Sequence, residues 1–473
     1  MPFASIHFLF IFLPIVLAVY LLIPNRLWRN LAILVSSLVY IAWEDLAHLP
    51  VLLVSVVLNY LFGLWIGSAL EKANPGKARK LTWLAVLVNL LILFFYKYLG
   101  FFGGILQTLS NGHILIENRA LPLGISYFTF TGLSYILDVS AQVEKPERNL
   151  LYLASYLVMF PKLVQGPITR YKALREDISN PKVSMTDLAE GARRFIIGLG
   201  KKVILADSLR VAADSVFEAD FSLMGAGVAW FGLLAYTLQI YFDFAGYTDM
   251  AIGVGRFLGF KLPENFNFPY ISRSISEFWR RWHMTLTSWF RTYVFIPLEF
   301  ARKKEKVLRQ QSNLLIVFLL TGLWHGATWN FLLWGIYFGL VLAIEASGLA
   351  KVLKKLPKAL QHIYTLLLVM LGWVFFRITD LGEWGGFLKA LIGANGWQGE
   401  ITLRTLNILF YFPIIILGVL FSIPLLQKFT SKAEASSRTL GIALDFALLG
   451  VFVIALVYIL TTGYSSFIYA QFL

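Results

Sequence analysis

The side chains in this sequence that could do chemistry are two histidines set among tryptophans. His325 lies in the motif GLWHG, and His283 follows the residues FWRRW. From Asn313 to Ile344 His325 is the one histidine, and no charged side chain accompanies it. A neutral imidazole in such apolar surroundings keeps one nitrogen free to accept a proton. This chemistry suits a general base that activates a hydroxyl or a thiol.

Each histidine also has a structural interpretation. A buried histidine can join two helices through hydrogen bonds, and His283 could lie at a membrane interface beside aromatic residues. An ionisable group at bilayer depth is costly, which favours a functional role for His325. The neighbouring Trp324 could help to line a dry pocket, and Trp282 directly precedes His283.

Two further polar residues stand out in their surroundings. Asp243 lies in the apolar stretch YFDFAG, where a carboxylate must pair or become protonated. It could orient a histidine or neutralise an arginine between Arg273 and Arg291, although a structural ion pair is the simpler expectation. Asn265 lies in a loop, where its amide could orient a substrate or satisfy interrupted backbone.

The composition is that of a membrane protein. Hydrophobic residues make up 58% of the 473 positions and charged residues only 14%, whereas soluble domains carry roughly 25% charged residues. Only helices or closed barrels satisfy the backbone in a bilayer, and the alternation expected of barrel strands is missing. We therefore predict an all-α, multi-pass protein with a single domain spanning residues 1–473.

The net charge of +14 arises from lysines and arginines in short loops, which is typical of cytoplasmic loops and not of a nucleic-acid-binding surface. The absence of cysteine excludes disulfides, cysteine-ligated metals and thiol nucleophiles. HExxH and phosphate-binding loop motifs are also missing, so we expect no metal.

Apolar runs predict roughly ten to twelve membrane segments. The run 313–345 would be about 50 Å long as one helix, longer than the roughly 30 Å hydrocarbon core. A break at Gly322 to Thr328 is therefore expected, with His325 at the apex of a helical hairpin. Residues 166–222 and 261–312 are mixed in polarity and predict interfacial or re-entrant helices. The runs are 4–24, 30–43, 49–67, 81–101, 121–140, 150–165, 223–242, 313–345, 359–377, 405–426 and 439–461.

Several long motifs occur in a fixed order: LPLGISYFTFTGLSYILDV (121–139), MFPKLVQGPITRY (159–171), YFDFAGYTDMAIGVGRFLGF (241–260), PENFNFPYISRSISEFWRRWHMTLTSWFRTYVFIPL (263–298), GLWHGATWNFLLWG (322–335) and YSSFIYAQF (464–472). Together they resemble the membrane-bound O-acyltransferase (MBOAT) superfamily, and within it the alginate O-acetylation branch. The resemblance implies one helical domain around a central funnel, in which His325 is catalytic and His283 has a supporting role. It also implies acetyl-CoA as the cytoplasmic donor and an extracytoplasmic partner acetylase that modifies an exopolysaccharide.

The chain departs from the branch in two places. The branch usually has LRDYLYIPLGG where this chain has FRTYVFIPLEFARKKEKV, and the pattern FPxLIAGPI appears as FPKLVQGPI. These departures leave alginate open as the acceptor. The related teichoic-acid D-alanylation proteins use a carrier-protein thioester as donor.

We therefore expect an O-acyltransferase of the bacterial inner membrane that moves acetyl groups onto an exported polysaccharide. Membrane lipid is an expected partner and nucleic acid is not. The alternatives are acyl transfer to a lipid or a teichoic acid, a transporter built on broken helices, and a scaffold of a polysaccharide secretion complex. The expected catalytic residues are His325 and His283, and the supporting or substrate-path residues are Trp324, Asn330, Asp243, Trp282, Arg280 and Asn265.

Overall fold

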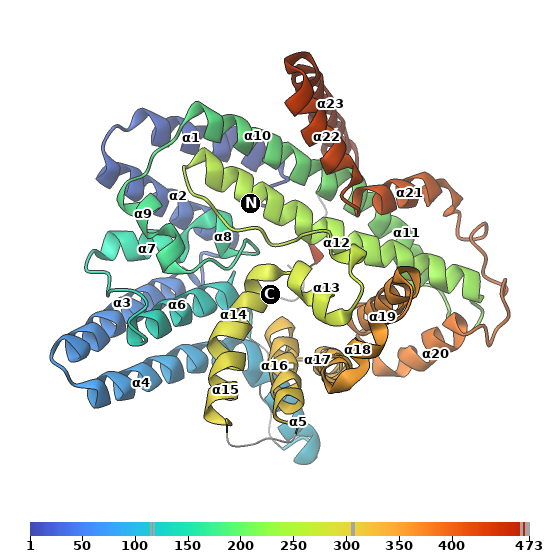
Figure 1. The fold of residues 1–473 in the computed structure, drawn as a ribbon, viewed down its shortest axis with the longest axis horizontal. Helices are drawn as coiled ribbons and strands as arrows, with labels where there is room; N and C mark the ends of the chain where they lie inside the picture. The colour runs from blue at the N-terminus through green and yellow to red at the C-terminus, as the bar shows by residue number, and fades with distance from the viewer. Residues whose placement is uncertain (114–115, 117–118, 304–307, 464–466, 469–473) are drawn as a thin grey trace. The chain divides into compact units, whose positions relative to one another are not determined.

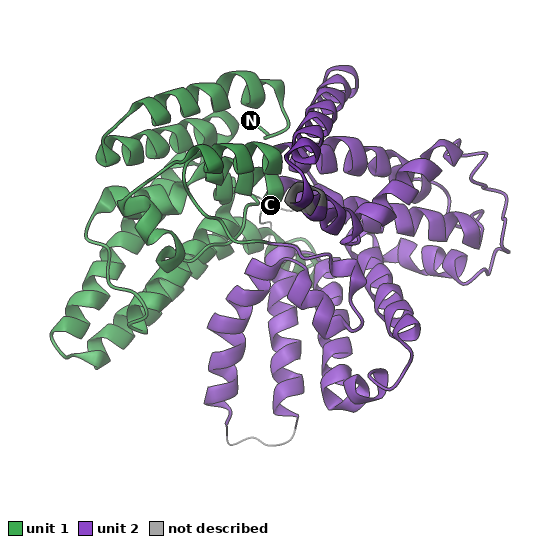
Figure 2. Cartoon of the chain, turned by 45° about the horizontal axis from the view of Figure 1, so that its top comes forward, with its two compact units in different colours: residues 1–195, 248–264, 469–473 green, residues 196–247, 265–468 purple. Residues whose placement is uncertain are grey.

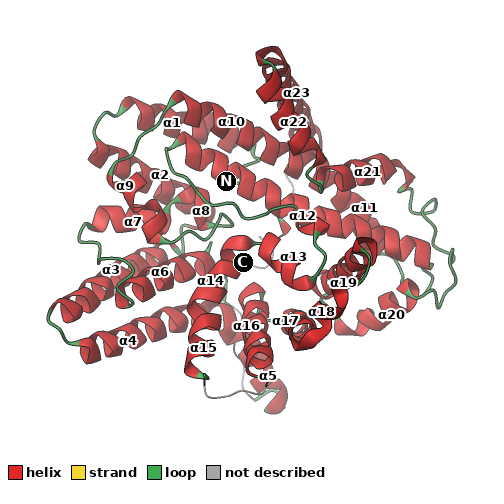
Figure 3. Cartoon of the chain, in the orientation of Figure 1, coloured by secondary structure: helices red, strands yellow, loops and turns green. Residues whose placement is uncertain are grey.

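The computed structural model is all-helical, as predicted (Figures 1 and 3). It describes residues 1–113, 116, 119–303, 308–463 and 467–468. Within these ranges the only β pairings are two isolated bridges, of Met224 with Gly399 and of Met224 with Ile401. Of the motif at 464–472, all but Phe467 and Ile468 lie outside the described residues.

The chain forms two compact units, shown in different colours in Figure 2. Unit 1 contains residues 1–195 and 248–264, and unit 2 contains residues 196–247 and 265–468. Both histidines of interest belong to unit 2.

Six helices in the described part of the chain are long and apolar enough to cross a membrane. Phe8–Leu22 and Leu409–Phe421 are shorter apolar helices. The protein is therefore a multi-pass membrane protein, in which several of the predicted segments are short or broken helices. The six long helices are Leu49–Glu71, Pro75–Leu109, Ala226–Phe257, Trp329–Leu353, Lys358–Arg377 and Arg438–Thr462.

Unit 1 is built from helices that contact one another through small and polar side chains. Asn59 donates to Asn89 Oδ1 over 3.1 Å, a buried amide contact of the kind that joins membrane helices. The predicted run 150–165 forms two helices because the chain turns at Met159, ahead of Pro161. The helices are α1 (Leu13–Leu22), α2 (Arg26–Asp45), α3 (Leu49–Glu71), α4 (Pro75–Leu93), α5 (Leu99–Leu109), α6 (Ile125–Ser140), α7 (Leu150–Val158), α8 (Phe160–Leu163), α9 (Tyr171–Ser179) and α10 (Met185–Gly200), whose last turn belongs to unit 2.

Unit 2 carries the longer helices and the short helices around the histidines. These are α11 (Asp207–Phe217), α12 (Ala226–Phe257), whose residues from Thr248 onward belong to unit 1, α13 (Ile275–Arg281), α14 (Met284–Phe290), α15 (Ile296–Ala301), α16 (Arg309–His325), α17 (Trp329–Ile344), α18 (Ala350–Leu353), α19 (Lys358–Arg377), α20 (Leu381–Leu391), α21 (Phe412–Phe421), α22 (Leu425–Ser436) and α23 (Arg438–Thr462). Turns of π-helix adjoin several of them, including η3 (Lys201–Ala206), η5 (Arg291–Phe295) and η6 (Glu345–Leu349).

The helical hairpin predicted around His325 is present. Helix α16 ends at His325 and α17 begins at Trp329, so the break falls within the predicted stretch. The two helices pack so closely that a Cβ on Gly322 would lie only 2.3 Å from the carbonyl oxygen of Phe331. Glycine at this position lets the two backbones meet.

Helix α12 extends beyond the predicted apolar run 223–242 and ends only at Phe257. Two carboxylates lie in the added part, and each has a cationic partner in its own unit. Asp243 pairs with Lys202 at 2.7 Å in unit 2, and Asp249 pairs with Arg194 at 2.7 Å in unit 1. Paired in this way, the charges do not end the helix.

Candidate active site

His283 is held between two short helices by a neighbouring loop. The loop and the α13–α14 junction are joined by two backbone hydrogen bonds, from Asn267 N to Arg281 O and from Met284 N to Asn265 O, each 2.9 Å long. His283 itself has φ 42° and ψ 53°, a left-handed conformation that is uncommon outside glycine. Strained backbone of this kind concentrates at functional sites.

The ring of His283 is buried and has one side-chain partner. Its Nδ1 lies 3.0 Å from Asn265 Oδ1, and its ring stands perpendicular to that of Phe244 at 4.7 Å. Asn265 Oδ1 also accepts from the backbone N–H and the hydroxyl of Thr285. Burial lowers the pKa of His283 to about 3, so the imidazole is neutral at physiological pH.

His325 lies at the end of α16 in a cage of aromatic rings. Its ring centroid is 5.0 Å from that of Trp324, 5.0 Å from Trp334 and 5.2 Å from Phe376. The side chain is only 3% exposed. Trp324 also approaches His283, with ring centroids 5.9 Å apart. The structure thus brings both predicted histidines to one tryptophan, although they are far apart in the sequence.

Asn330 and Trp282 are buried close to these rings, whereas Arg280 is not. Asn330 donates to the carbonyl oxygen of Phe375 over 3.2 Å, while its own Oδ1 has no hydrogen-bond partner within the described chain. Trp282, the residue before His283, packs against Trp373, with ring centroids 4.9 Å apart. Arg280 is exposed at the end of α13.

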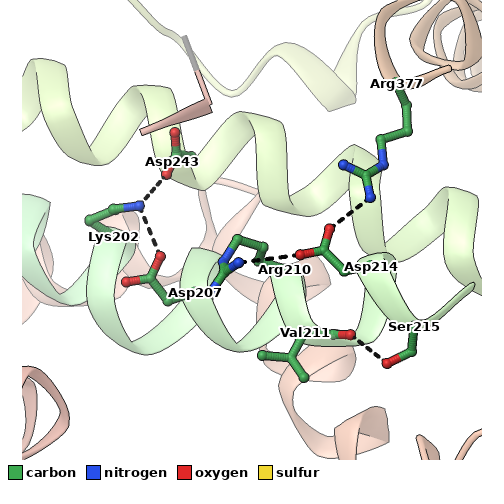
Figure 4. Close-up of polar contacts among 8 residues, drawn as sticks. All are labelled: Lys202, Asp207, Arg210, Val211, Asp214, Ser215, Asp243 and Arg377. Carbon is green, nitrogen blue, oxygen red and sulfur yellow. Dashed lines mark hydrogen bonds and ion pairs between the residues drawn. The ribbon is translucent and has the colours of Figure 1, made fainter. Parts of the chain in front are cut away.

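Asp243 contacts neither histidine. It accepts a hydrogen bond from Lys202, and Lys202 also donates to Asp207 over 2.8 Å (Figure 4). The second oxygen of Asp243 accepts from the backbone N–H of Ile468 over 2.8 Å. Of the interpretations open for Asp243, the structure therefore shows the ion pair, with Lys202 as the cation instead of an arginine of 273–291.

Figure 4 shows a second charged group beside this one, in which Asp214 lies between Arg210 and Arg377. Lys202 is 1% exposed, and although burial opposes its charge, the two carboxylates raise its pKa. Sequence reasoning did not single out Lys202. Its position in KKVILAD, in apolar surroundings five residues before an aspartate, was the available signal.

Glu345 is a second residue that sequence reasoning missed. It is 1% exposed and accepts from the backbone N–H groups of Ile275 and Ser276, over 2.7 and 2.9 Å, and from the Ser276 hydroxyl over 2.6 Å. A carboxylate at the first turn of a helix satisfies N–H groups that have no partner within the helix. Glu345 thereby fixes the start of α13, the helix that leads to His283.

No cluster of three or more histidine, aspartate or glutamate side chains suited to a metal ion occurs in the part of the chain that the structure describes. The polar side chains of the site are two imidazoles and two buried amides, which lie among aromatic rings.

The sequence is similar to those of acyl-transferring proteins. The pattern of the membrane-bound O-acyltransferase family matches residues 38–376. A probable alginate O-acetylase AlgI of Azotobacter vinelandii is 37% identical, with 100% of both chains covered. A peptidoglycan O-acetyltransferase of Helicobacter pylori is 34% identical over 82% of this chain and 79% of its own. A teichoic acid D-alanyltransferase of Bacillus subtilis is 33% identical over 54% of this chain and 66% of its own.

Proposed function

Because this chain belongs to the membrane-bound O-acyltransferase family, we propose that it moves an acetyl group from cytoplasmic acetyl-CoA across the membrane for the O-acetylation of an exported polysaccharide. O-acyl transfer itself follows from the family and from relatives named for such reactions. The acetyl group and the polysaccharide are supported by the names of two relatives, an alginate O-acetylase and a peptidoglycan O-acetyltransferase.

The observation that carries the proposal is the pair of buried histidines at Trp324. In the proposed reaction the acceptor oxygen attacks the thioester carbonyl, the new C–O bond forms, and the C–S bond breaks. An imidazole takes the hydroxyl proton and returns it to the leaving thiolate. His325 acts as this base or relays the acyl group, and His283 lines the path.

The aromatic cage around His325 has a separate role in the proposal. Trp324, Trp334 and Phe376 surround the imidazole and leave it 3% exposed. Excluding water in this way protects a thioester from hydrolysis while it waits for the acceptor.

The proposal also covers the setting of the enzyme. We place it in the bacterial inner membrane, where all 473 residues act as one domain and an extracytoplasmic acetylase receives the acetyl group. The exposed apolar side chains of helices such as α23, only 6% of whose apolar stretch is buried, then contact lipid.

The test compares wild type with His325→Ala in cells that produce the polysaccharide, at matched membrane levels of protein. Ester-linked acetate in the extracellular polysaccharide should fall to background in the variant. His113→Ala changes an exposed histidine of unit 1 and serves as the control. Unchanged acetate in His325→Ala would overturn the assignment and favour a scaffold or a transporter.

Acyl transfer to a teichoic acid or a lipid is the second candidate, favoured by the 33% identity to a teichoic acid D-alanyltransferase. A deletion strain separates the two, because the ester is lost from a different product in each case. Loss of ester from the lipid or teichoic acid fraction, with polysaccharide acetate intact, would replace our proposal with this one.

A further inference from the structure

The contacts of Asn265 determine which nitrogen of His283 carries the proton. Asn265 Oδ1 lies 3.3 Å from the backbone nitrogen of Thr285, and a backbone N–H can only donate. The amide atom at this position is therefore the oxygen, an acceptor. His283 Nδ1, 3.0 Å from the same oxygen, must be the donor in that contact.

A neutral imidazole that is protonated at Nδ1 carries its lone pair at Nε2. His283 Nε2 is buried and has no hydrogen-bond partner among the described residues. Asn265 Nδ2, at the other end of the same contact, is also buried and equally without a partner in that part of the chain. Buried polar atoms in native proteins are nearly always hydrogen-bonded, so an open acceptor on His283 and an open donor on Asn265 indicate that a polar ligand binds at these residues.

The backbone holds this arrangement in place before any ligand arrives. Met284 N donates to Asn265 O over 2.9 Å, and His283 is kept in its left-handed conformation at the start of α14. The rings of Phe244 and Trp324 restrict the imidazole on its sides, at 4.7 and 5.9 Å. An orienting group that fixes the tautomer of a base is the arrangement expected for proton transfer at the opposite nitrogen.

We propose that Asn265 is a positioning residue that fixes His283 as the Nδ1–H tautomer, and that His283 Nε2 accepts the proton of the hydroxyl that attacks the acyl donor. This inference rests on the acyl transfer proposed above and gives His283 the proton-accepting role in it. The hydroxyl oxygen forms the ester bond, the C–S bond of the thioester breaks, and Nε2 passes the proton to the departing thiolate. In this scheme His325, within its aromatic cage, contacts the acyl group and does not take the hydroxyl proton.

A spectroscopic experiment tests the tautomer without relying on activity. The chain has six histidines, so the ring nitrogens of ¹⁵N-histidine-labelled protein in lipid bilayers can be resolved by solid-state NMR, and His283→Gln identifies the signals of His283. We expect a protonated Nδ1 and a bare Nε2 in wild type, and a mixture of tautomers in Asn265→Ala. Asn267→Ala, an exposed residue of the same loop, should leave the signals unchanged.

Two results would overturn the inference. The first is a wild-type His283 with its proton on Nε2. The second is an Asn265→Ala spectrum identical to that of wild type. The wild-type tautomer is read with His283→Gln as the only variant, so this part of the test does not depend on whether Asn265→Ala folds.

Kinetics supply the second part of the test. Asn265→Ala should lower kcat for acetyl transfer about 10- to 100-fold with a smaller change in KM. Asn265→Asp keeps an acceptor oxygen at the same position and should recover most of the rate. A loss of kcat in Asn265→Ala without any change of tautomer would overturn the positioning role, because Asn265 would then affect the reaction by another route. If wild type itself transfers no acetyl group, the proposed function fails, whereas the spectra still report on Asn265 and His283.

Discussion

Replacing Asp243 by asparagine removes one charge from a buried group and leaves its shape unchanged. Lys202 Nζ lies 2.7 Å from Asp243 and 2.8 Å from Asp207, so each carboxylate accounts for part of the stabilisation of the ammonium. The two pairs differ in burial. Asp243 is 3% exposed and Asp207 21% exposed, while their shared lysine is 1% exposed.

This difference in burial sets the expected magnitudes. Breaking a buried ion pair by removing one partner costs about 3–5 kcal/mol, and we expect the lower end for Asp243→Asn because Lys202 keeps Asp207. A partly exposed pair contributes about 1 kcal/mol or less, which is the expected cost of Asp207→Asn. The Asp243 variant also weakens the acceptor for Ile468 N–H, next to Phe467, whose ring lies 4.5 Å from the Lys202 ammonium.

The assay is thermal denaturation of the purified protein in detergent, followed by the fraction that stays monodisperse on size-exclusion chromatography. For a chain of this length 1 kcal/mol corresponds to about 1 °C in Tm, so we expect a fall of about 3 °C for Asp243→Asn and about 1 °C for Asp207→Asn. An equal or larger fall for Asp207→Asn would refute the argument that burial decides the cost. A large loss of acetyl transfer in Asp243→Asn at unchanged Tm would instead point to a direct role for Asp243 in the reaction.

Two further outcomes follow from buried groups near His283. Glu345→Ala removes three charge-assisted acceptor contacts at the start of α13, worth about 1.5–3 kcal/mol each before relaxation, and should reduce both Tm and acetyl transfer. Glu345→Gln keeps one acceptor oxygen and should lose less of both; equal losses would contradict the capping role. The lowered pKa of His283, to about 3 against 6.5, means that the unfolded chain binds a proton which the folded chain does not. Stability from this group is therefore complete above pH 6.5 and falls by about 2 kcal/mol on lowering the pH to 5. Chemical denaturation at pH 7.5 and 5 should show this loss of unfolding free energy in wild type and a smaller loss in His283→Gln. Equal losses in the two proteins would show that His283 is not buried as a neutral group.

The sequence allowed the elements that depend on length and local pattern to be predicted. The break near His325 followed from one comparison, because a run of that length cannot cross the bilayer as a single straight helix. The all-helical fold followed from composition, since the backbone in a bilayer must satisfy its own hydrogen bonds. Both arguments use quantities that are read directly along the chain.

The contacts that define the site could not be predicted in the same way. Asn265 meets His283 across 18 residues, and Lys202 meets Asp243 across 41. Glu345 reaches Ile275 across 70. Such partners depend on how helices pack, and periodicity along a single helix gives no information about them. The continuation of α12 beyond its apolar run has the same origin, because its carboxylates are neutralised by residues that the run itself does not contain.

In unit 2, some buried polar side chains have all their acceptor oxygens occupied, whereas others keep an open polar atom. Both oxygens of Asp243 and of Glu345 are occupied by donors from the chain. His283 Nε2, Asn265 Nδ2 and Asn330 Oδ1 are as deeply buried and have no such partner in the described residues. An open polar atom in an apolar interior costs about 1–3 kcal/mol, a cost that substrate atoms can relieve on binding. The free protein should therefore be measurably less stable than its complex: at a ligand concentration 100 times Kd, the gain is about 2.7 kcal/mol. Thermal denaturation with and without acetyl-CoA or an acceptor sugar measures this gain. A ligand that contacts Asn265 and His283 should raise Tm less in Asn265→Ala than in Asn267→Ala.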